Sequence, residues 1–348
     1  MNIFTRFRTK FRIVEIIRTG LFLIVPVSTY SQSFVGVSSN PADNANISAT
    51  TVAVTPPAGA QAGDLVVIYA QYRAAGATLS MSSLSGQSWT SEGANSGGNQ
   101  TTRIFWSRFN GTWGANPSVT GPGASIALSV IMYVYRPTNP LNSWIVDVAQ
   151  SNTAITATAV SITGVTTNSP KTVTMAFWAS PVATTWGSLN GTGWTKTGLG
   201  NQYRNTAGSD QSHTAAYNIQ ATATTVANVS QTQNSSQNTR RTIITWAELM
   251  PPSNDDCGGA VNLAINSACS SIPGTLAGAH PSSIALGGSC PGSLVADVWY
   301  KFQAVNNTAT VTLGSVGSGI TNPRIEVLTG TCTGFSTIAC GTSSLTMP

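Results

Sequence analysis

The chain has 348 residues, which is enough for two domains that each have a hydrophobic core. Charged residues make up 8% of it and hydrophobic residues 41%, which excludes the composition typical of intrinsic disorder. Much of the net charge of +5 lies in the first 20 residues, and the remainder holds 11 basic against 10 acidic residues. We therefore expect no basic surface for binding nucleic acid.

Residues 1–31 are predicted to be a secretory signal peptide. A basic start precedes the apolar run Gly20–Val27, and the small residues Thr29 and Ser31 lie just before an expected cleavage at Gln32. The apolar run is far shorter than the roughly 20 residues that cross a bilayer. The sequence therefore indicates export, with no membrane insertion after the signal is removed.

Residues 33–250 are predicted to be antiparallel β-structure. Short runs rich in β-branched and aromatic residues alternate there with turn residues, as in "DLVVIYAQY" and "KTVTMAFWAS". Thr51–Thr90 parallels Ala159–Thr195, and each copy ends on a G-x-x-W-T turn. We expect one jelly-roll-like β-sandwich with an internal duplication, with two small separate sandwiches as the alternative.

The segment 251–256 is predicted to be a linker, with an Asx turn favoured over a calcium site at Asn254–Asp256. All five cysteines follow it, at positions 257, 269, 290, 332 and 340. Their spacing favours the disulfides Cys257–Cys269 and Cys332–Cys340 and leaves Cys290 unpaired. No pattern typical of a metal site or a cofactor is present.

Residues 257–348 are predicted to form a second, disulfide-containing β-sandwich. Its strand "DVWYKF", Asp297–Phe302, alternates so that Val298, Tyr300 and Phe302 point into the core. Trp299 is expected on the other face, packed at a sheet edge, with a role as a ligand platform as the alternative.

The residues "NDDC" at 254–257, the strand "DVWYKF" and the Cys332/Cys340 loop together resemble a β-sandwich module of large secreted proteins from bacteria with a type IX export system. The resemblance implies a non-catalytic module of a secreted or surface protein. Such modules continue with another strand after the second cysteine of that loop, so the resemblance also predicts an incomplete module, an open sheet edge and further domains downstream. Residues 33–250 are more loosely similar to jelly-roll modules of bacterial surface and phage-structural proteins, on "PPAGAQAGDLVVIYA" and the G-x-x-W-T turns.

The sequence offers little support for catalysis. It has no G-x-S-x-G motif, and the acidic residues of 33–250 are scattered. His213 has serine and aspartate beside it in sequence, but a catalytic triad requires groups that converge in space. We therefore expect no enzyme.

The tryptophans are the residues best suited to binding, because exposed indole faces stack on sugar rings. Trp113 and Trp186 lie beside polar loops and are the candidate glycan-binding residues, with burial in the core as the competing interpretation. Trp89 and Trp194, which are equivalent in the repeat, are expected in the core. The sequence thus predicts a secreted or cell-surface adhesion or binding protein with glycans as the leading ligand class. The alternatives are a non-catalytic N-terminal region of a larger secreted hydrolase and a structural spacer.

Overall fold

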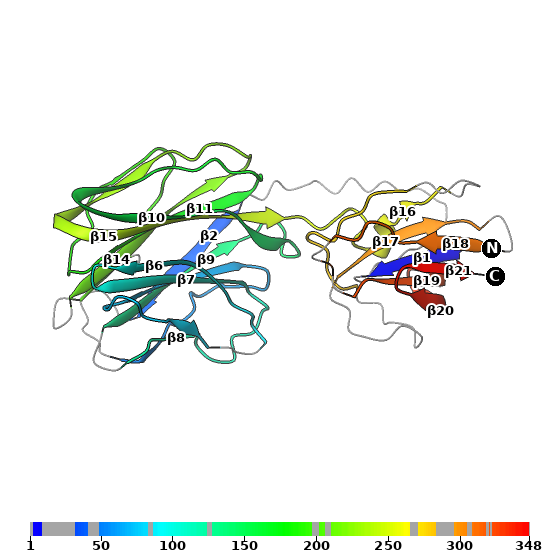
Figure 1. Ribbon diagram of the computed structural model, residues 1–348, viewed down its shortest axis with the longest axis horizontal. Coiled ribbons are helices and arrows are strands. Elements are labelled where there is room, and N and C mark those ends of the chain that lie inside the picture. The colour runs from blue at the N-terminus through cyan, green and yellow to red at the C-terminus, as the bar shows by residue number, and fades with distance from the viewer. Residues whose placement is uncertain are drawn as a thin grey trace. The chain divides into compact units, whose positions relative to one another are not determined.

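The computed structural model describes most of the chain. The described residues are 3–8, 32–40, 49–82, 86–123, 127–196, 202–205, 210–264, 271–282, 296–304, 308–317, 320 and 322–347. They form β-strands joined by loops, together with one short 3₁₀ turn, η1 (Cys257–Gly259), which confirms the predicted all-β fold (Figure 1). Within these ranges no helix is long and apolar enough to cross a membrane.

The chain divides into two compact units, which are described separately. The N-terminal unit is Ser28–Glu248. The C-terminal unit combines Leu249–Pro348 with the beginning of the chain, Met1–Val27. The segment 251–256, predicted to be a linker, therefore belongs to the C-terminal unit.

The first half of the N-terminal unit contains two sheets. The larger has the order β2-β9-β4-β7-β6 and the smaller β3-β8-β5, and neighbouring strands in both sheets are antiparallel. The strands are β2 (Ser33–Asn40), β3 (Thr51–Ala53), β4 (Leu65–Tyr72), β5 (Ser80–Met81), β6 (Thr90–Gly97), β7 (Gln100–Arg108), β8 (Ser118–Thr120) and β9 (Leu128–Arg136). Because β2, β4, β7 and β9 lie in one sheet and β3, β5 and β8 in the other, this half has the strand order of a jelly roll, with β6 added outside β7.

The second half repeats the order of the larger sheet. Its strands are β10 (Ser143–Ile162), β11 (Thr172–Ser180), β12 (Leu189–Asn190), β13 (Gln202–Asn205), β14 (Gln211–Gln220) and β15 (Val229–Leu249). Their order is β10-β15-β11-β14-β13, with β12 paired to β15. Strands β4, β7 and β9 thus correspond to β11, β14 and β15. Both halves lie within one compact unit, Ser28–Glu248.

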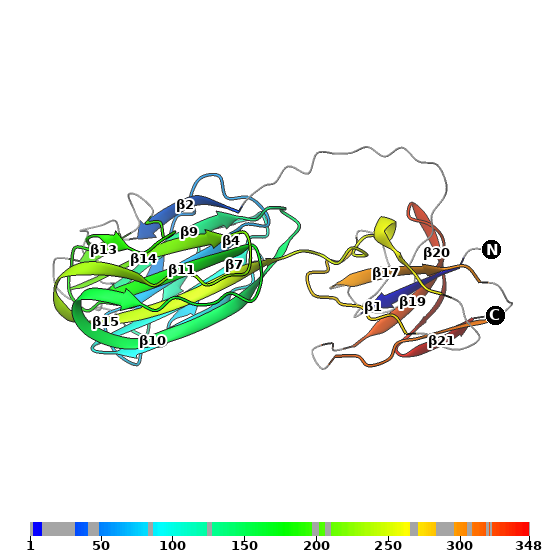
Figure 2. The same ribbon diagram turned by 90° about the horizontal axis from the view of Figure 1, so that it is seen from above.

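The two halves are joined by a common core. One buried cluster takes Leu65, Tyr69 and Tyr133 from the first half together with Phe177 and Trp246 from the second, and the ring centroids of Tyr69 and Phe177 are 4.7 Å apart. The larger sheets of the two halves therefore face each other. Figure 1 shows them as two layers, and in Figure 2 the green sheet of the second half lies in front of the cyan strands of the first. Further clusters cover the outer face of each sheet. Strands β4 and β11 are consequently buried on both faces, which explains why they read as continuous apolar runs.

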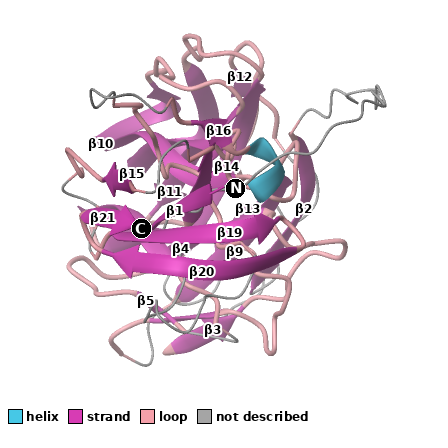
Figure 3. Cartoon of the chain, turned by 90° about the vertical axis from the view of Figure 1, so that its right-hand side faces the viewer, coloured by secondary structure: helices cyan, strands magenta, loops and turns pink. Residues whose placement is uncertain are grey.

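The C-terminal unit is a smaller arrangement of two sheets. The larger has the order β16-β17-β1-β19-β20, and the smaller pairs β18 with β21. Figure 3 labels β1, β19 and β20 of the larger sheet. Its strands are β1 (Ile3–Arg8), β16 (Val261–Asn262), β17 (Asp297–Phe302), β18 (Ala309–Thr312), β19 (Arg324–Thr331), β20 (Gly334–Gly341) and β21 (Ser344–Met347). Residues 3–8, which fall in the predicted signal peptide, thus form an interior strand of this sheet.

The strand "DVWYKF" is core, but the place expected for Trp299 was wrong. All six residues of β17 are buried, and Trp299 has no exposed surface, with its ring stacked on Phe335 at 5.5 Å. The reason is that β17 lies inside the sheet, between β16 and β1, and not at an edge. The open edge expected beside it is therefore occupied. The segment after Cys340 was expected to be little more than a turn, but it includes β21, whose Met347 is buried.

The predicted disulfide pairing was also wrong. Cys257 is bonded to Cys332, with a Cα–Cα distance of 5.8 Å, so neither residue pairs with its neighbour in sequence. Cys340 is itself disulfide-bonded, whereas Cys269 and Cys290 lie outside the described residues. The packing of η1 against the sheet brings Cys257 to the end of β19, which the spacing of cysteines along the chain does not reveal.

Candidate functional site

Trp113 lies on the loop that follows β7. Its ring stacks on the buried ring of Phe109, with centroids 4.0 Å apart and planes inclined by 17°. The indole is half-buried, because Phe109 covers one of its faces. Only the opposite face and the ring edge of Trp113 can therefore meet a ligand.

The loop before β4 forms the other side of this site. Asp64 is almost fully buried, and both of its carboxylate oxygens accept hydrogen bonds from the guanidinium of Arg136, at 3.1 and 3.0 Å. Arg136 also donates to the carbonyl of Gly59 at 2.6 Å, and the Gln61 N–H donates to Asp64 at 2.8 Å. A bidentate ion pair to a buried carboxylate holds its partners in a fixed geometry, so it fixes the loop that carries Pro56 and Pro57.

Backbone hydrogen bonds join the two loops. The Gly63 N–H donates to the Phe109 carbonyl and the Phe109 N–H to the Asp64 carbonyl, both at 2.8 Å. Gly63 has φ +95°, and a Cβ at this position would lie 2.3 Å from the carbonyl oxygen of Pro140. Glycine is therefore required where the loop turns into β4. At the other end, the Asn116 amide donates to the Thr55 hydroxyl at 3.2 Å.

Between the loops lies a surface depression of about 300 Å³, at the small end of the range for ligand sites. It is lined by Pro56, Pro57, Ala58, Gly59, Ala60, Trp113 and Asn116. None of these side chains ionises near neutral pH, so the lining offers no group for general acid or base catalysis. It offers an indole, proline rings and an exposed amide, which suit the C–H faces and hydroxyl groups of a sugar.

Trp186, the other tryptophan predicted to bind a ligand, does not contribute to a site. Only 4% of it is exposed, and it belongs to the core cluster on the outer face of the second sheet. A tryptophan buries a large apolar area, and the loop after β11 uses Trp186 in this way. Trp194 is buried in the same cluster, as expected, whereas Trp89 is only half-buried against the outer cluster of the first sheet.

His213 lies inside the N-terminal unit, with no exposed surface. Its Nε2 is 3.1 Å from the hydroxyl of Ser129, and its ring packs beside Tyr69. Burial lowers the pKa of His213 from 6.5 to about 3, so the imidazole is neutral at physiological pH. A substrate cannot reach this ring in the fold as it stands.

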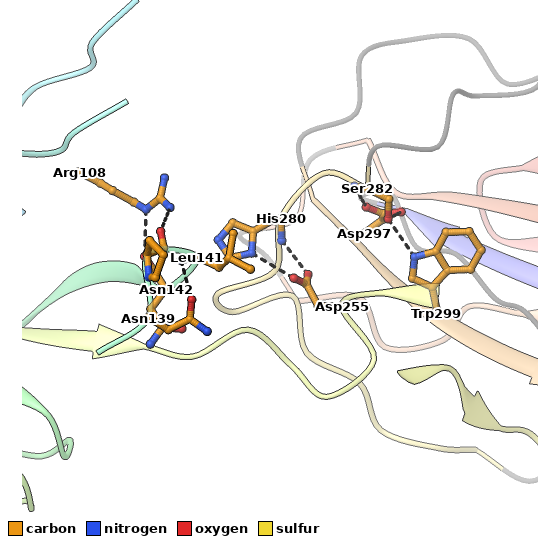
Figure 4. A network of polar contacts seen from close by, with 10 residues as sticks. Arg108, Asn139, Leu141, Asn142, Asp255, His280, Ser282, Asp297 and Trp299 are labelled. Carbon is orange, nitrogen blue, oxygen red and sulfur yellow. Dashed lines mark hydrogen bonds and ion pairs between the residues drawn. The ribbon is translucent and has the colours of Figure 1, made fainter. Parts of the chain in front are cut away.

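The polar residues near "NDDC" are used within the C-terminal unit. The Asn254 side chain donates to the Trp299 carbonyl at 3.0 Å, and Asp255 accepts from His280 Nδ1 at 3.0 Å. The hydroxyl of Ser282 donates to Asp297 at 2.7 Å and accepts from the Trp299 indole at 2.9 Å (Figure 4). Asn254 and Asp255 therefore anchor β17 and the 280 loop. Ser253 and Asn254 also lie in a turn, which the Asp255 N–H closes by donating to the Pro252 carbonyl at 2.9 Å. The Ser282 hydroxyl is hydrogen-bonded to Asp297 and to Trp299, an arrangement that does not prepare it as a nucleophile.

Trp113 was identified as a candidate from the sequence, whereas none of the residues that line the depression with it was. Pro56, Pro57 and Asn116 become part of one site only because β4 and β7 are neighbours in the sheet. A sequence signal existed in "TPPAGAQAGD", where two prolines, two glycines and an aspartate predict a shaped loop before a strand. Elsewhere, the described ranges hold no group of three His, Cys, Asp or Glu residues placed to bind a metal.

Comparisons with known proteins leave the site to be interpreted on its own geometry, since no family model, no curated protein and no solved structure matches this chain.

Proposed function

We propose that the protein is a secreted or cell-surface binding protein whose N-terminal unit binds glycans at the depression around Trp113. The observation that carries the proposal is Trp113 itself: it is a half-buried indole, held flat on Phe109, that lines an open depression. A fixed ring loses little conformational freedom when a ligand stacks on it. The type IX resemblance of the C-terminal unit and the signal-like N-terminus are the basis for export.

The composition of the lining supports binding without catalysis. Proline and tryptophan supply apolar faces, and Asn116 supplies an exposed amide that can exchange hydrogen bonds with hydroxyl groups. An anionic ligand is disfavoured, because the lining contains no cationic side chain. We therefore propose neutral oligosaccharides as the ligand class and no enzymatic activity for this unit.

Trp113→Ala is expected to weaken glycan binding by roughly 10-fold or more, because truncating a stacked tryptophan at a binding site typically costs at least 1–2 kcal/mol. The full chain is first tested on an array of neutral and charged oligosaccharides. The affinity for the best neutral oligosaccharide is then measured by titration calorimetry. Asn116→Ala, which leaves the Phe109 stack intact, is expected to weaken binding by a smaller factor.

Asn168→Ala is the matched control, because Asn168 is an exposed asparagine of the second half that is not part of the lining. Its affinity should equal that of the unchanged protein. Equal binding by the Trp113→Ala and Asn168→Ala variants would contradict this site. Failure of the full chain to bind any oligosaccharide would favour the spacer role over the binding role.

A further inference from the structure

The larger sheet of the C-terminal unit is built from both ends of the chain. Strand β1 lies between β17 and β19 and is antiparallel to both. Removing it would leave β17 and β19 with facing rows of unpaired backbone groups in the middle of a sheet, which is costly in free energy and attracts other strands. The sheet therefore has an interior position that is filled by β1 and by none of the described strands of 249–348.

The alternation along β1 matches this position on one face. Ile3, Thr5 and Phe7 are in register with Phe302, Tyr300 and Val298 of β17, three residues of the unit's buried cluster. On the other side, Thr5 is in register with the buried Val327 of β19. The position thus accepts a strand with apolar residues at alternate places.

The other face of the position carries charges of both signs. Arg6 is in register with Glu326 of β19, whereas Arg8 is in register with Asp297 of β17 and also with Arg324 of β19. Glu326 has no exposed surface, and it accepts a hydrogen bond from Thr337 at 2.9 Å. A buried carboxylate is stabilised by opposite charge, so a basic residue opposite Glu326 in an inserted strand complements the site.

We propose that the gap between β17 and β19 is a strand-acceptor site for an extended peptide. The peptide lies antiparallel to both strands, with apolar residues at alternate places and a basic residue opposite Glu326. Residues 3–8 occupy the site while they are attached to the chain. Because they fall within the predicted signal peptide, their removal on export would open the site to a segment of the same pattern from another polypeptide. The proposal is independent of the glycan site.

The first test asks whether β1 completes the sheet in the full chain. Thr5→Pro removes a backbone donor from the middle of β1, whereas Thr9→Pro lies just beyond the strand and is the control. Hydrogen exchange of the β17 and β19 amides is measured by mass spectrometry. We expect protection to fall at least about 10-fold in Thr5→Pro and to stay unchanged in Thr9→Pro. Unchanged protection in both variants overturns the proposal.

The second test asks whether the site accepts a strand that is not covalently attached. A protease recognition sequence is inserted between residues 10 and 20 of the full chain, the chain is cut, and a labelled peptide with the sequence of residues 2–9 is added. Saturable binding to the cut protein, and at least about 10-fold weaker binding to the uncut protein, is expected because the attached strand competes at high effective concentration. Equal binding to cut and uncut protein, or no binding to either, overturns the proposal.

Charge specificity is tested with the same cut protein. A peptide carrying Arg6→Glu should bind roughly 10-fold or more weakly, because it places a second carboxylate opposite the buried Glu326. A Glu326→Gln protein should discriminate less between the two peptides. A peptide of the same composition in scrambled order should not bind. Equal affinity for all three peptides would show non-specific strand pairing and would contradict the acceptor site as proposed.

Discussion

Replacing both Cys257 and Cys332 by alanine is expected to lower the free energy of unfolding of the C-terminal unit by about 2–4 kcal/mol. The two cysteines are separated by 75 residues, so their bond restricts a long loop of the unfolded chain. The N-terminal unit contains neither cysteine and should keep its stability. Denaturant unfolding of the full chain, followed by hydrogen exchange in each unit, measures the two effects separately.

The two single variants provide the control, because they test the pairing itself. If Cys257 and Cys332 are bonded to each other, either substitution alone removes the bond, and the second should add less than about 1 kcal/mol. If each cysteine were instead bonded to a different cysteine nearby in sequence, the decreases in unfolding free energy caused by the two single substitutions would add. Additive losses would therefore contradict the Cys257–Cys332 bond, and peptide mapping without reduction should show the same pairing directly.

Lowering the pH from 7 to 5 is expected to destabilise the N-terminal unit by about 2 kcal/mol through His213 alone. Burial lowers the pKa of His213 to about 3 in the folded protein, whereas an unfolded histidine keeps a pKa near 6.5. Between these two values the unfolded state binds a proton that the folded state does not. The contribution of His213 is therefore fully present above pH 6.5 and is lost as the pH falls towards 3.

His213→Gln is the matched variant, because glutamine is neutral over this range and can still hydrogen-bond to Ser129. The substitution is expected to flatten the dependence of unfolding free energy on pH between 6.5 and 4.5, whatever it does to stability at pH 7. Denaturant unfolding at half-unit intervals of pH measures both slopes. Identical slopes in the two proteins would mean that His213 is protonated, or accessible to water, in the folded state.

Much of the fold is local and could therefore be predicted from the sequence. Short β-branched and aromatic runs between turn residues are typical of strands, so β4, β9, β11 and β17 were identified by pattern. The repeat also follows from sequence alone, and the two larger sheets have the same strand order. Burial of β4 and β11 on both faces was not predicted, although an apolar run without alternation has no face to turn towards water.

The candidate site was only half predictable. Trp113 and Trp186 have the same residue type and similar polar neighbours in sequence, yet one lines a depression and the other is core. The difference arises from the loop that packs beside each. The loop of Pro56 and Pro57 leaves one face of Trp113 uncovered, whereas Trp186 is enclosed by the outer cluster of the second sheet. Such contacts join residues far apart in the chain, and no local pattern encodes them.

By itself the sequence determined the strand-forming segments, the repeat, the scarcity of charge and the buried character of "DVWYKF", because each depends on residues that are neighbours in the chain. Only the tertiary structure decided the partner of Cys257, the difference between Trp113 and Trp186, and the place of residues 3–8 between β17 and β19. The physical reason is the same in all three cases. Each strand must pair its backbone groups and bury its apolar side chains within the complete sheet. Which residues a segment contacts therefore depends on the position that the rest of the fold leaves open to it.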